Sequence, residues 1–410
     1  MLIKPRNIFL RDVTLVSIAQ VISGASFFCY TLIVARSLSI PDYGLFQAIM
    51  ALYGTIAFFH LPLSFGAVHC VGAATQEESR NVLGEFIKIS GFFGAVTALL
   101  VVLISPWLVS GFHADSSMLF IILALLVFTR PVLSSIYGGM QGKRLYSVFT
   151  TAKIIESILC LLFGLLLLVL GAKVPGALAG YLISTVVILL FFVKTRNHYH
   201  FVPGFTRVRE EFYALRWILL SFLVLMVVDN APIIIGRSKL SLELSGFYGA
   251  LYNLRNMVLP FAFAVIVPFY SRMASTHNES YILLKALTMV SLLAVAFIFL
   301  GFFCSELIFK ILYGSGFVEA SIHMVRYGFS LWLQMLAMVI MFYQIAIKRK
   351  AFVVLLVPVV VLIVHILSQE INISGLISAQ IVAWGAYLMV TLTWQFVPMV
   401  TKDKTIKKHD

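Results

Sequence analysis

Long apolar runs follow one another along the chain from residue 13 to residue 398, separated by short polar loops. Each run has roughly the 20 residues that an α-helix needs to cross a bilayer core about 30 Å thick. The runs do not alternate apolar and polar positions, as the strands of a membrane barrel would. The pattern therefore predicts membrane-spanning helices. The twelve predicted spans cover residues 13–34, 44–66, 86–109, 117–138, 147–170, 174–194, 214–236, 246–270, 282–303, 322–346, 351–367 and 374–398.

A polar, basic loop at about residues 195–213 separates two halves of six predicted spans each. It contains Pro203 and Gly204, which are typical of an irregular connection. The sequence therefore predicts an N-terminal bundle over residues 1–204 and a C-terminal bundle over residues 205–410. No loop on either side is long enough to fold as a soluble domain.

A faint internal repeat relates the two halves. In the first half, Ala35-Arg36-Ser37 ends the first span, and Asp42-Tyr43-Gly44-Leu45-Phe46 opens the second. In the second half, Gly236-Arg237-Ser238 ends the seventh span, and Ser245-Gly246-Phe247-Tyr248-Gly249 opens the eighth. Both motifs fall on the same side of the membrane. The expected repeat is therefore parallel, about an axis along the membrane normal.

Lysine and arginine are distributed unevenly between the two sides. With the N-terminus inside, the inner segments hold eighteen of them, the outer loops five, and the spans the remaining seven. Cytoplasmic loops carry such an excess, so both termini are expected in the cytoplasm. This distribution also accounts for the net charge of +13 without a nucleic-acid partner. Only 11% of the residues are charged, against roughly a quarter in a soluble domain, which fits a multi-pass membrane protein.

No motif for catalysis, a metal or a cofactor stands out. The sequence has no glycine-rich phosphate loop, no zinc-type spacing and no nucleophile elbow. The four cysteines show neither metal-ligand spacing nor a disulfide framework: they are Cys29, Cys70, Cys160 and Cys304. The expected protein is therefore not an enzyme, and it is expected to need no metal or cofactor.

Several charged residues lie inside predicted spans. A charge at the bilayer centre costs about 3 kcal/mol on insertion scales, so it needs a partner or a polar surrounding. Lys153 and Glu156 share one face of a helix, which favours a local ion pair. Arg130 precedes Pro131, which is expected to kink the helix. Two interpretations of Arg130 remain open, a position on a central cavity or pairing with a neighbouring helix.

Asp229 lies in the seventh span and Arg255 in the eighth. Both fall in the outer halves of their spans, and a short loop joins the two spans. The two side chains are therefore expected at a similar depth. They form either a structural ion pair or part of a cavity wall that binds an anionic or protonated group.

Four segments resemble motifs of the polysaccharide flippases, a family of the multidrug/oligosaccharidyl-lipid/polysaccharide exporter superfamily. They follow one another in order over nearly the whole chain and are Ala35–Phe46, Tyr137–Lys143, Ser245–Ala250 and Leu312–Phe317, the last with Ala320. The pair Lys143-Arg144 departs from the pattern, because the family often has an aromatic residue there. Each segment alone is a weak signal, whereas the four together are fairly specific.

The resemblance implies twelve helices in two six-helix bundles around a central cavity. It also implies a flippase of the bacterial inner membrane that works by alternating access. Its cargo would be a polyprenyl-diphosphate-linked oligosaccharide, an O-antigen or similar repeat unit, moved from the cytoplasmic to the periplasmic leaflet. Buried arginines suit a diphosphate, so Arg130, Arg255 and Arg36 are the expected substrate-path residues. Asp229 and Glu156 are the weaker candidates for ion coupling.

The expected partners are membrane lipids, the lipid-linked oligosaccharide, a polysaccharide polymerase and a chain-length regulator, all implied by the resemblance. Two other functions are weighed against a flippase. A cation-coupled multidrug exporter would share the fold, but its cavity should favour acidic and aromatic residues, whereas the charges buried here are more often basic. A membrane glycan polymerase or ligase should display a large outer loop, and none is present.

Overall fold

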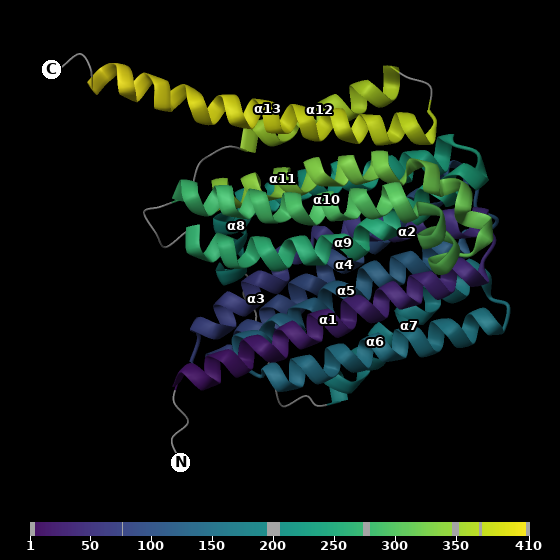
Figure 1. Cartoon of the computed structure of the whole chain (residues 1–410). Coiled ribbons are helices and arrows are strands. Elements are labelled where there is room, and N and C mark those ends of the chain that lie inside the picture. The colour runs from purple at the N-terminus through teal and green to yellow at the C-terminus, as the bar shows by residue number, and fades with distance from the viewer. Residues whose placement is uncertain are drawn as a thin grey trace. The chain divides into compact units, whose positions relative to one another are not determined.

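The computed structural model describes residues 5–75, 77–194, 206–273, 279–346, 352–368 and 371–406. These residues form thirteen α-helices and one 3-10 helix, η2, with no strand among them (Figure 1). The elements are α1 (Pro5–Ser37), α2 (Ile40–Phe58), α3 (Leu61–Ala73), α4 (Glu78–Gly111), α5 (Met118–Gly142), α6 (Tyr146–Val169), α7 (Lys173–Lys194), α8 (Thr206–Lys239), α9 (Leu242–Met273), α10 (Glu279–Leu312), η2 (Ser315–His323), α11 (Met324–Ala346), α12 (Phe352–Ser368) and α13 (Ile373–Ile406). The all-helical architecture predicted from the apolar runs is confirmed.

The second predicted span consists of two helices rather than one. α2 ends at Phe58, α3 begins at Leu61, and Pro62 lies in the first turn of α3. Proline has no N–H donor, which a first turn tolerates and a helix interior does not, so a new helix begins here. A tight bond from His60 N to Ala57 O, 3.1 Å long, closes the turn between them. The pair still forms one apolar stretch of 34 residues, long enough to cross a membrane.

The membrane-spanning elements agree with the predicted count of twelve. Among the described residues, eight helical stretches are long and apolar enough to cross a membrane, the α2–α3 pair being one of them. Val21–Ser37 of α1 and Leu356–Ser368 of α12 are shorter apolar helices. α8 and α9 have 34 and 32 residues. At 1.5 Å per residue each is about 50 Å long, more than a bilayer core requires.

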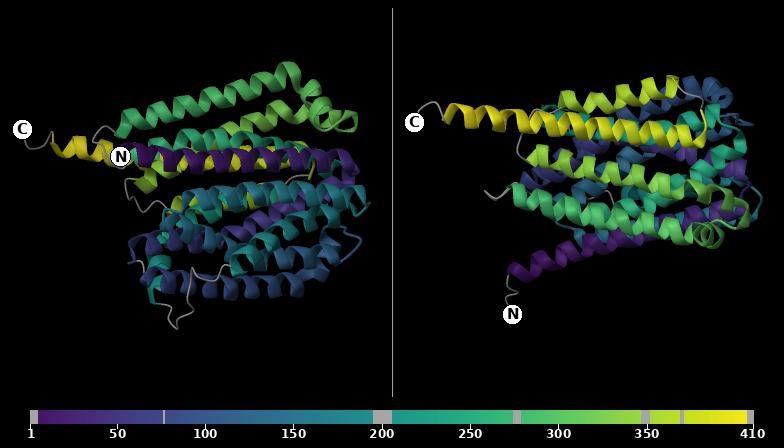
Figure 2. Two further views of the ribbon diagram at one scale, coloured as in Figure 1. Left: turned by 90° about the horizontal axis from the view of Figure 1, so that it is seen from below. Right: turned by 45° about the horizontal axis from the view of Figure 1, so that its top comes forward.

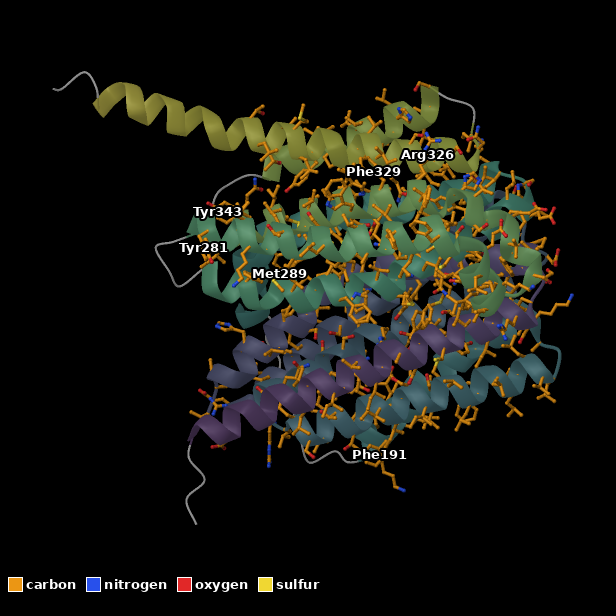
Figure 3. The ribbon with its side chains drawn as sticks, in the orientation of Figure 1. Phe191, Tyr281, Met289, Arg326, Phe329 and Tyr343 are labelled. Carbon is orange, nitrogen blue, oxygen red and sulfur yellow. The ribbon has the colours of Figure 1, made fainter. Side chains whose placement is uncertain are left out.

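Large apolar side chains cover the outer surface of the helices. Phe191 of α7, Tyr281 and Met289 of α10, and Phe329 of α11 are between 40% and 62% exposed (Figure 3). Water disfavours so extensive an apolar surface, whereas lipid chains accept it without cost. The exposed surface therefore fits a multi-pass membrane protein.

The chain divides into two compact units. Unit 1 comprises Met1–Leu219 and Ser241–Gly249, and unit 2 comprises Leu220–Leu240 and Ala250–Asp410. α8 and α9 thus contribute residues to both units. Within each unit, the helices run roughly along a common direction (Figure 2). The predicted boundary between residues 204 and 205 lies outside the described residues, so the division at that point stays a prediction.

Glycines allow three helices of unit 1 to approach closely. A Cβ atom at Gly180 of α7 would lie 2.4 Å from Cα of Gly164 in α6. A Cβ atom at Gly164 would lie 2.3 Å from the ring of Tyr30 in α1. The Tyr30 hydroxyl donates a hydrogen bond to the carbonyl of Ala177 in α7. This junction holds α1 against α6 and α7 at the place where the candidate site lies.

The helix α5 lies among the other helices of unit 1 and contacts α3, α4, α6 and α7. Its buried residues Leu133 and Tyr137 belong to an apolar cluster that also contains Phe86 of α4 and Phe149 of α6. The helix is continuous through Pro131. Because this helix is packed on several sides, the side chains on its remaining face, including Arg130, have fixed neighbours.

Unit 2 is built from two closely packed helix pairs, α10 with α11 and α12 with α13. Gly328 of α11 faces α10, where an added Cβ atom would lie 2.9 Å from Ile298. Trp332 of α11 donates a hydrogen bond of 3.0 Å to Ser291 of α10. α13 has 34 residues and extends well beyond α12, which has 17 (Figure 2).

Candidate functional site

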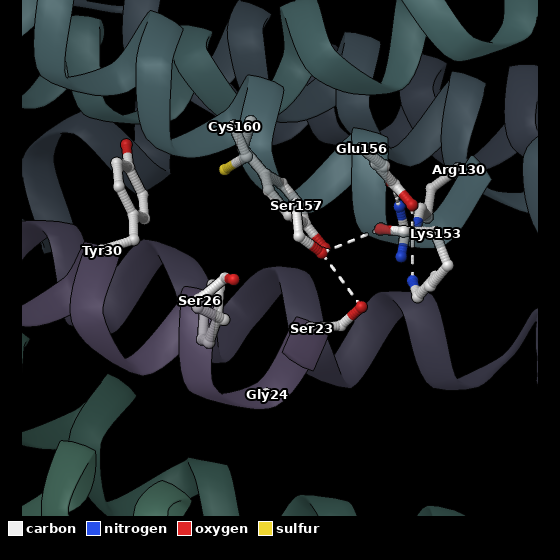
Figure 4. Close-up of a pocket in the computed structure, with 11 residues that line it drawn as sticks. Ser23, Gly24, Ser26, Tyr30, Arg130, Lys153, Glu156, Ser157 and Cys160 are labelled. Carbon is white, nitrogen blue, oxygen red and sulfur yellow. Dashed lines mark hydrogen bonds and ion pairs between the residues drawn. The ribbon is translucent and has the colours of Figure 1, made fainter. Parts of the chain in front are cut away.

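A cavity of about 200 Å³ lies inside unit 1, between α1, α5, α6 and α7 (Figure 4). Arg130 of α5 and Tyr181 of α7 line it together with Lys153, Glu156 and Ser157 of α6. One face of α1 forms the opposite wall. Charged and hydroxyl-bearing side chains therefore surround a cavity within a bundle of apolar helices. Such a concave site with a few convergent polar groups is the default candidate for ligand binding.

Glu156 is the shared acceptor at the back of this cavity. Arg130 Nη1 forms an ion pair and hydrogen bond with Glu156 Oε1. The Tyr137 hydroxyl donates a hydrogen bond of 3.0 Å to Glu156 Oε2, and Lys153 Nζ lies 3.4 Å from the same oxygen. The carboxylate thus meets one donor on Oε1 and two on Oε2. We call Arg130, Lys153 and Glu156 the charged triad.

The two cations of the charged triad are more exposed than the carboxylate. The side chain of Glu156 is 4% exposed, whereas those of Arg130 and Lys153 are 17% and 18% exposed. Two positive charges and one negative charge leave the charged triad with a formal charge of +1. The buried carboxylate thus holds two cations that are more exposed than it is, and such an arrangement is able to bind an anion.

Aromatic rings support both cations from the side. The guanidinium carbon of Arg130 lies 5.5 Å from the ring centroid of Tyr181, and Lys153 Nζ lies 5.4 Å from that of Tyr137. Each distance is within the range at which a ring face attracts a cation. The rings restrict the position of the cations without neutralising their charge.

The α1 wall of the cavity is formed by Ser23, Gly24, Ser26, Phe27 and Tyr30. Residues spaced by three, four and seven positions lie on one face of a helix, so these side chains form one continuous surface. Ser23 Oγ lies 3.0 Å from Ser157 Oγ of α6, which joins this wall to the helix of the charged triad. We call these five residues the α1 face.

The structure brings several of the predicted charged residues together. The local pair of Lys153 and Glu156, expected from their spacing on one helix, is present. Of the two interpretations left open for Arg130, pairing with a neighbouring helix is present, because it binds Glu156 of α6. Its position on the central cavity stays a prediction, but Arg130 also lines a cavity. That cavity lies within unit 1.

Among the described residues, no group of three or more His, Cys, Asp or Glu side chains could hold a metal ion.

Asp229 and Arg255 form a buried ion pair in unit 2. Gln334 of α11 bridges them, since its Nε2 donates to Asp229 Oδ1 at 2.6 Å and its Oε1 accepts from Arg255 Nε at 3.3 Å. Arg255 also donates to Asn256 at 2.8 Å. The two side chains are 0% and 5% exposed. The expected structural pair is therefore present, and each partner is enclosed by polar neighbours.

Arg36 lies in the last turn of α1, where its side chain is exposed. It is not among the residues that line the cavity of unit 1.

The sequence did not predict two parts of the site, the α1 face and the ring of Tyr181. The spacing of Ser23 and Ser26 within an apolar span was an available signal, because two hydroxyls three positions apart mark a polar stripe on a helix.

Solved structures of membrane transporters share this fold. A multidrug resistance MATE family transporter of the MOP superfamily, inward-facing, matches with a TM-score of 0.74 and 14% identity over 96% of this chain and 99% of that one. The lipid II flippase MurJ, in an inward closed conformation, matches with a TM-score of 0.72 and 16% identity over 94% and 92%. A MOP superfamily transporter from Pyrococcus furiosus, described as having a binding pocket of reverse polarity, matches with a TM-score of 0.59 and 16% identity over 97% and 96%.

The sequence also matches a family profile. The profile of the family described as polysaccharide biosynthesis protein matches residues 33–322, which are 290 of the 410 residues. No curated protein matches the sequence. The chain therefore belongs to the polysaccharide biosynthesis protein family and has the fold of the MOP superfamily transporters, which confirms the resemblance to the flippases of that superfamily.

Proposed function

We propose that this protein is a flippase for a polyprenyl-diphosphate-linked oligosaccharide repeat unit, an O-antigen or a similar surface polysaccharide. The observation that carries the proposal is the cavity of unit 1, where Glu156 holds Arg130 and Lys153 beside a space of about 200 Å³. The formal charge of +1 on this group suits a diphosphate. Membership of the polysaccharide biosynthesis protein family and a fold shared with a lipid II flippase support this cargo class.

The chemistry of the cargo fits the chemistry of the site. A diphosphate carries two or more negative charges, and Arg130 is able to bind phosphate oxygens through two N–H groups at once. The sugars need a polar surface, which the hydroxyls of Ser23, Ser26 and Ser157 supply. The polyprenyl chain needs no pocket, since it stays in the bilayer. A lipid-linked sugar thus matches the charged triad, the α1 face and the apolar exterior.

The direction and the location rest on charge distribution and on the resemblance. We propose that both termini are cytoplasmic, that the membrane is the bacterial inner membrane and that alternating access moves the cargo to the periplasmic leaflet. Arg255 and Arg36 remain proposed contacts further along the substrate path, and Asp229 and Glu156 remain proposed sites of ion coupling. A polymerase and a chain-length regulator are the protein partners we expect.

The first experiment compares lipid-linked sugars and surface polysaccharide in cells that carry the wild-type gene, no gene, or Arg130→Ala and Arg130→Lys variants. Loss of the gene should strand the repeat units on the cytoplasmic leaflet and remove the surface glycan. Arg130→Ala should reduce translocation by at least tenfold, and Arg130→Lys by less, because lysine keeps the charge but not the fork of donors. Full translocation by both variants at normal protein levels would contradict the role of Arg130.

A matched control separates the site from a general loss of arginine. Arg326 of α11 lies in unit 2, where it donates a hydrogen bond to Ser378 of α13, and it does not line the cavity. Arg326→Gln should therefore translocate the repeat unit as the wild type does. Equal losses in Arg326→Gln and Arg130→Ala would point to impaired folding rather than to a binding site.

A multidrug exporter is the second candidate function, because one of the similar structures is a multidrug resistance MATE family transporter. The charges in the cavity disfavour it, since a cationic drug would meet two cations and one carboxylate that is already paired. The same cells distinguish the two functions. If loss of the gene leaves lipid-linked sugars translocated normally and lowers only drug tolerance, the exporter replaces the flippase.

A further inference from the structure

We infer that the α1 face is a subsite for a single sugar ring, the ring attached directly to the diphosphate. In this arrangement the charged triad binds the diphosphate, Ser23 and Ser26 bind hydroxyls of the first sugar, and Phe27 packs against its ring. The inference rests on the proposed function and adds to it the residues that distinguish one cargo from another.

The hydroxyls at this wall have hydrogen-bonding capacity to offer. Ser157 Oγ lies 2.9 Å from the carbonyl of Lys153 and 3.0 Å from Ser23 Oγ. Ser157 and Ser23 together carry two hydroxyl protons: one goes to the Lys153 carbonyl, and the other forms the hydrogen bond between the two serines. The pair therefore keeps oxygen lone pairs for a ligand, and these accept a hydrogen bond from a donor such as a sugar hydroxyl. A sugar hydroxyl both donates and accepts, so it matches such a pair better than a phosphate oxygen, which only accepts.

An aromatic surface lies next to these hydroxyls. The ring centroids of Phe27 and Tyr181 are 6.2 Å apart, with the ring planes inclined at 57°. Both rings line the cavity, and Tyr181 also lies beside Arg130. A sugar ring has an apolar face of C–H groups and an edge of hydroxyls. The α1 face offers an apolar ring and two hydroxyls side by side, which is the matching arrangement.

The volume of the cavity limits what enters it. Its 200 Å³ falls below the lower end, about 300 Å³, of pockets that enclose drug-sized ligands. The charged triad lines the same cavity, so this space also has to hold the diphosphate and leaves room for at most one sugar ring. The wall is open beside Gly24, because a Cβ atom placed on that residue would meet no other atom within 4 Å. Further sugars must therefore lie outside the α1 face.

The test uses purified full-length protein in lipid nanodiscs and two kinds of probe. One probe is farnesyl diphosphate, which has no sugar, and the other is a panel of farnesyl diphosphates linked to glucose, galactose or N-acetylglucosamine. The wild type should bind its best sugar-linked probe about tenfold more tightly than farnesyl diphosphate, the effect of one to two added hydrogen bonds. Thermophoresis measures both dissociation constants.

Two variants remove the sugar subsite and leave the charged triad intact. The double variant Ser23→Ala/Ser26→Ala should bind all probes equally, with the affinity of the wild type for farnesyl diphosphate. Gly24→Leu should do the same by filling the space beside the two serines. Matched controls are Ser37→Ala, an exposed serine of α1 bonded to the carbonyl of Ile33, and Gly91→Leu in α4, where an added Cβ also meets nothing within 4 Å.

The outcomes distinguish the subsite from the flippase. If the wild type binds farnesyl diphosphate but gains nothing from any sugar in the panel, the subsite is wrong and the diphosphate site stands. The same conclusion follows if the double serine variant keeps the tenfold preference. If the wild type binds none of the probes while remaining folded, the proposed cargo is wrong as well.

Discussion

Glu156 is the acceptor that Arg130, Lys153 and Tyr137 share, and each of these neighbours would lose a partner if it were removed. Breaking one side of a buried ion pair costs about 3–5 kcal/mol, because the remaining charge has no compensation. The loss of folding free energy in Glu156→Gln should lie towards the lower end of that range, since both cations are partly exposed to the cavity. The variant should still leave two cations facing that cavity.

We therefore expect Glu156→Gln to have two opposite effects. The variant should unfold at a lower temperature than the wild type, because Arg130 and Lys153 then repel each other without a counter-ion. It should bind inorganic diphosphate more tightly, because the charge of the group rises from +1 to +2. Thermal unfolding in detergent, with and without diphosphate, measures both effects. A lower melting temperature that diphosphate does not restore would argue against an anion site at this position.

The contacts of single residues show what the sequence could and could not predict. Lys153 and Glu156 lie on one helix, so their spacing alone predicts that they meet. Arg130 and Glu156 lie on different helices, and their contact depends on how each helix is rotated about its own axis. The spacing of residues along the sequence does not determine how two helices are rotated relative to each other. For Asp229 and Arg255, a short loop between their spans fixed a common depth, which allowed a pair to be foreseen.

At the scale of helices, the junction of α1, α6 and α7 depends on the absence of side chains. Gly164 and Gly180 face each other, and Tyr30 covers Gly164. In a membrane, helices associate through close packing rather than through the hydrophobic effect, so a small residue at a contact has a large influence. The apolar runs predicted the helices, but they did not reveal which glycines stand at contacts.

Gly180→Ala should accordingly destabilise unit 1. The added methyl group would lie 2.4 Å from the backbone of Gly164, so the helices would have to separate. Overpacking of this kind costs about 1–3 kcal/mol. Gly91→Ala is the control, because its methyl group would meet nothing within 4 Å. Thermal unfolding of the two variants in the same detergent tests the difference, and equal melting temperatures would contradict the close contact.

At the scale of the whole chain, the number of membrane-spanning elements followed from the sequence, while their continuity did not. The break between α2 and α3 arises at Pro62, inside what reads as one apolar run. A proline permits both a kinked helix and two separate helices, so the sequence leaves that choice open. The distribution of basic residues predicts the orientation independently of these details.

Reporter fusions check that orientation. Alkaline phosphatase, which is active only in the periplasm, should be inactive when fused after Lys194, at the end of α7, and active when fused after Ala172, in the turn before α7. The reason is that the segment after α7 is basic and the turn before it holds few basic residues. Comparable amounts of both fusions on an immunoblot provide the control. Activity after Lys194 and none after Ala172 would mean that the topology is inverted.

The wall of the cavity is divided between helices, with the charges on α5 and α6 and the hydroxyl-bearing face on α1. This division has a consequence for how such proteins diverge. Under the proposed function, a lineage that changes its surface glycan must still bind the diphosphate of an unchanged carrier lipid while it adapts to new sugars. Substitutions confined to α1 would change the second property without disturbing the first. If the α1 face binds the sugar as we propose, new cargo specificities are expected from single substitutions, each of which leaves the diphosphate site intact.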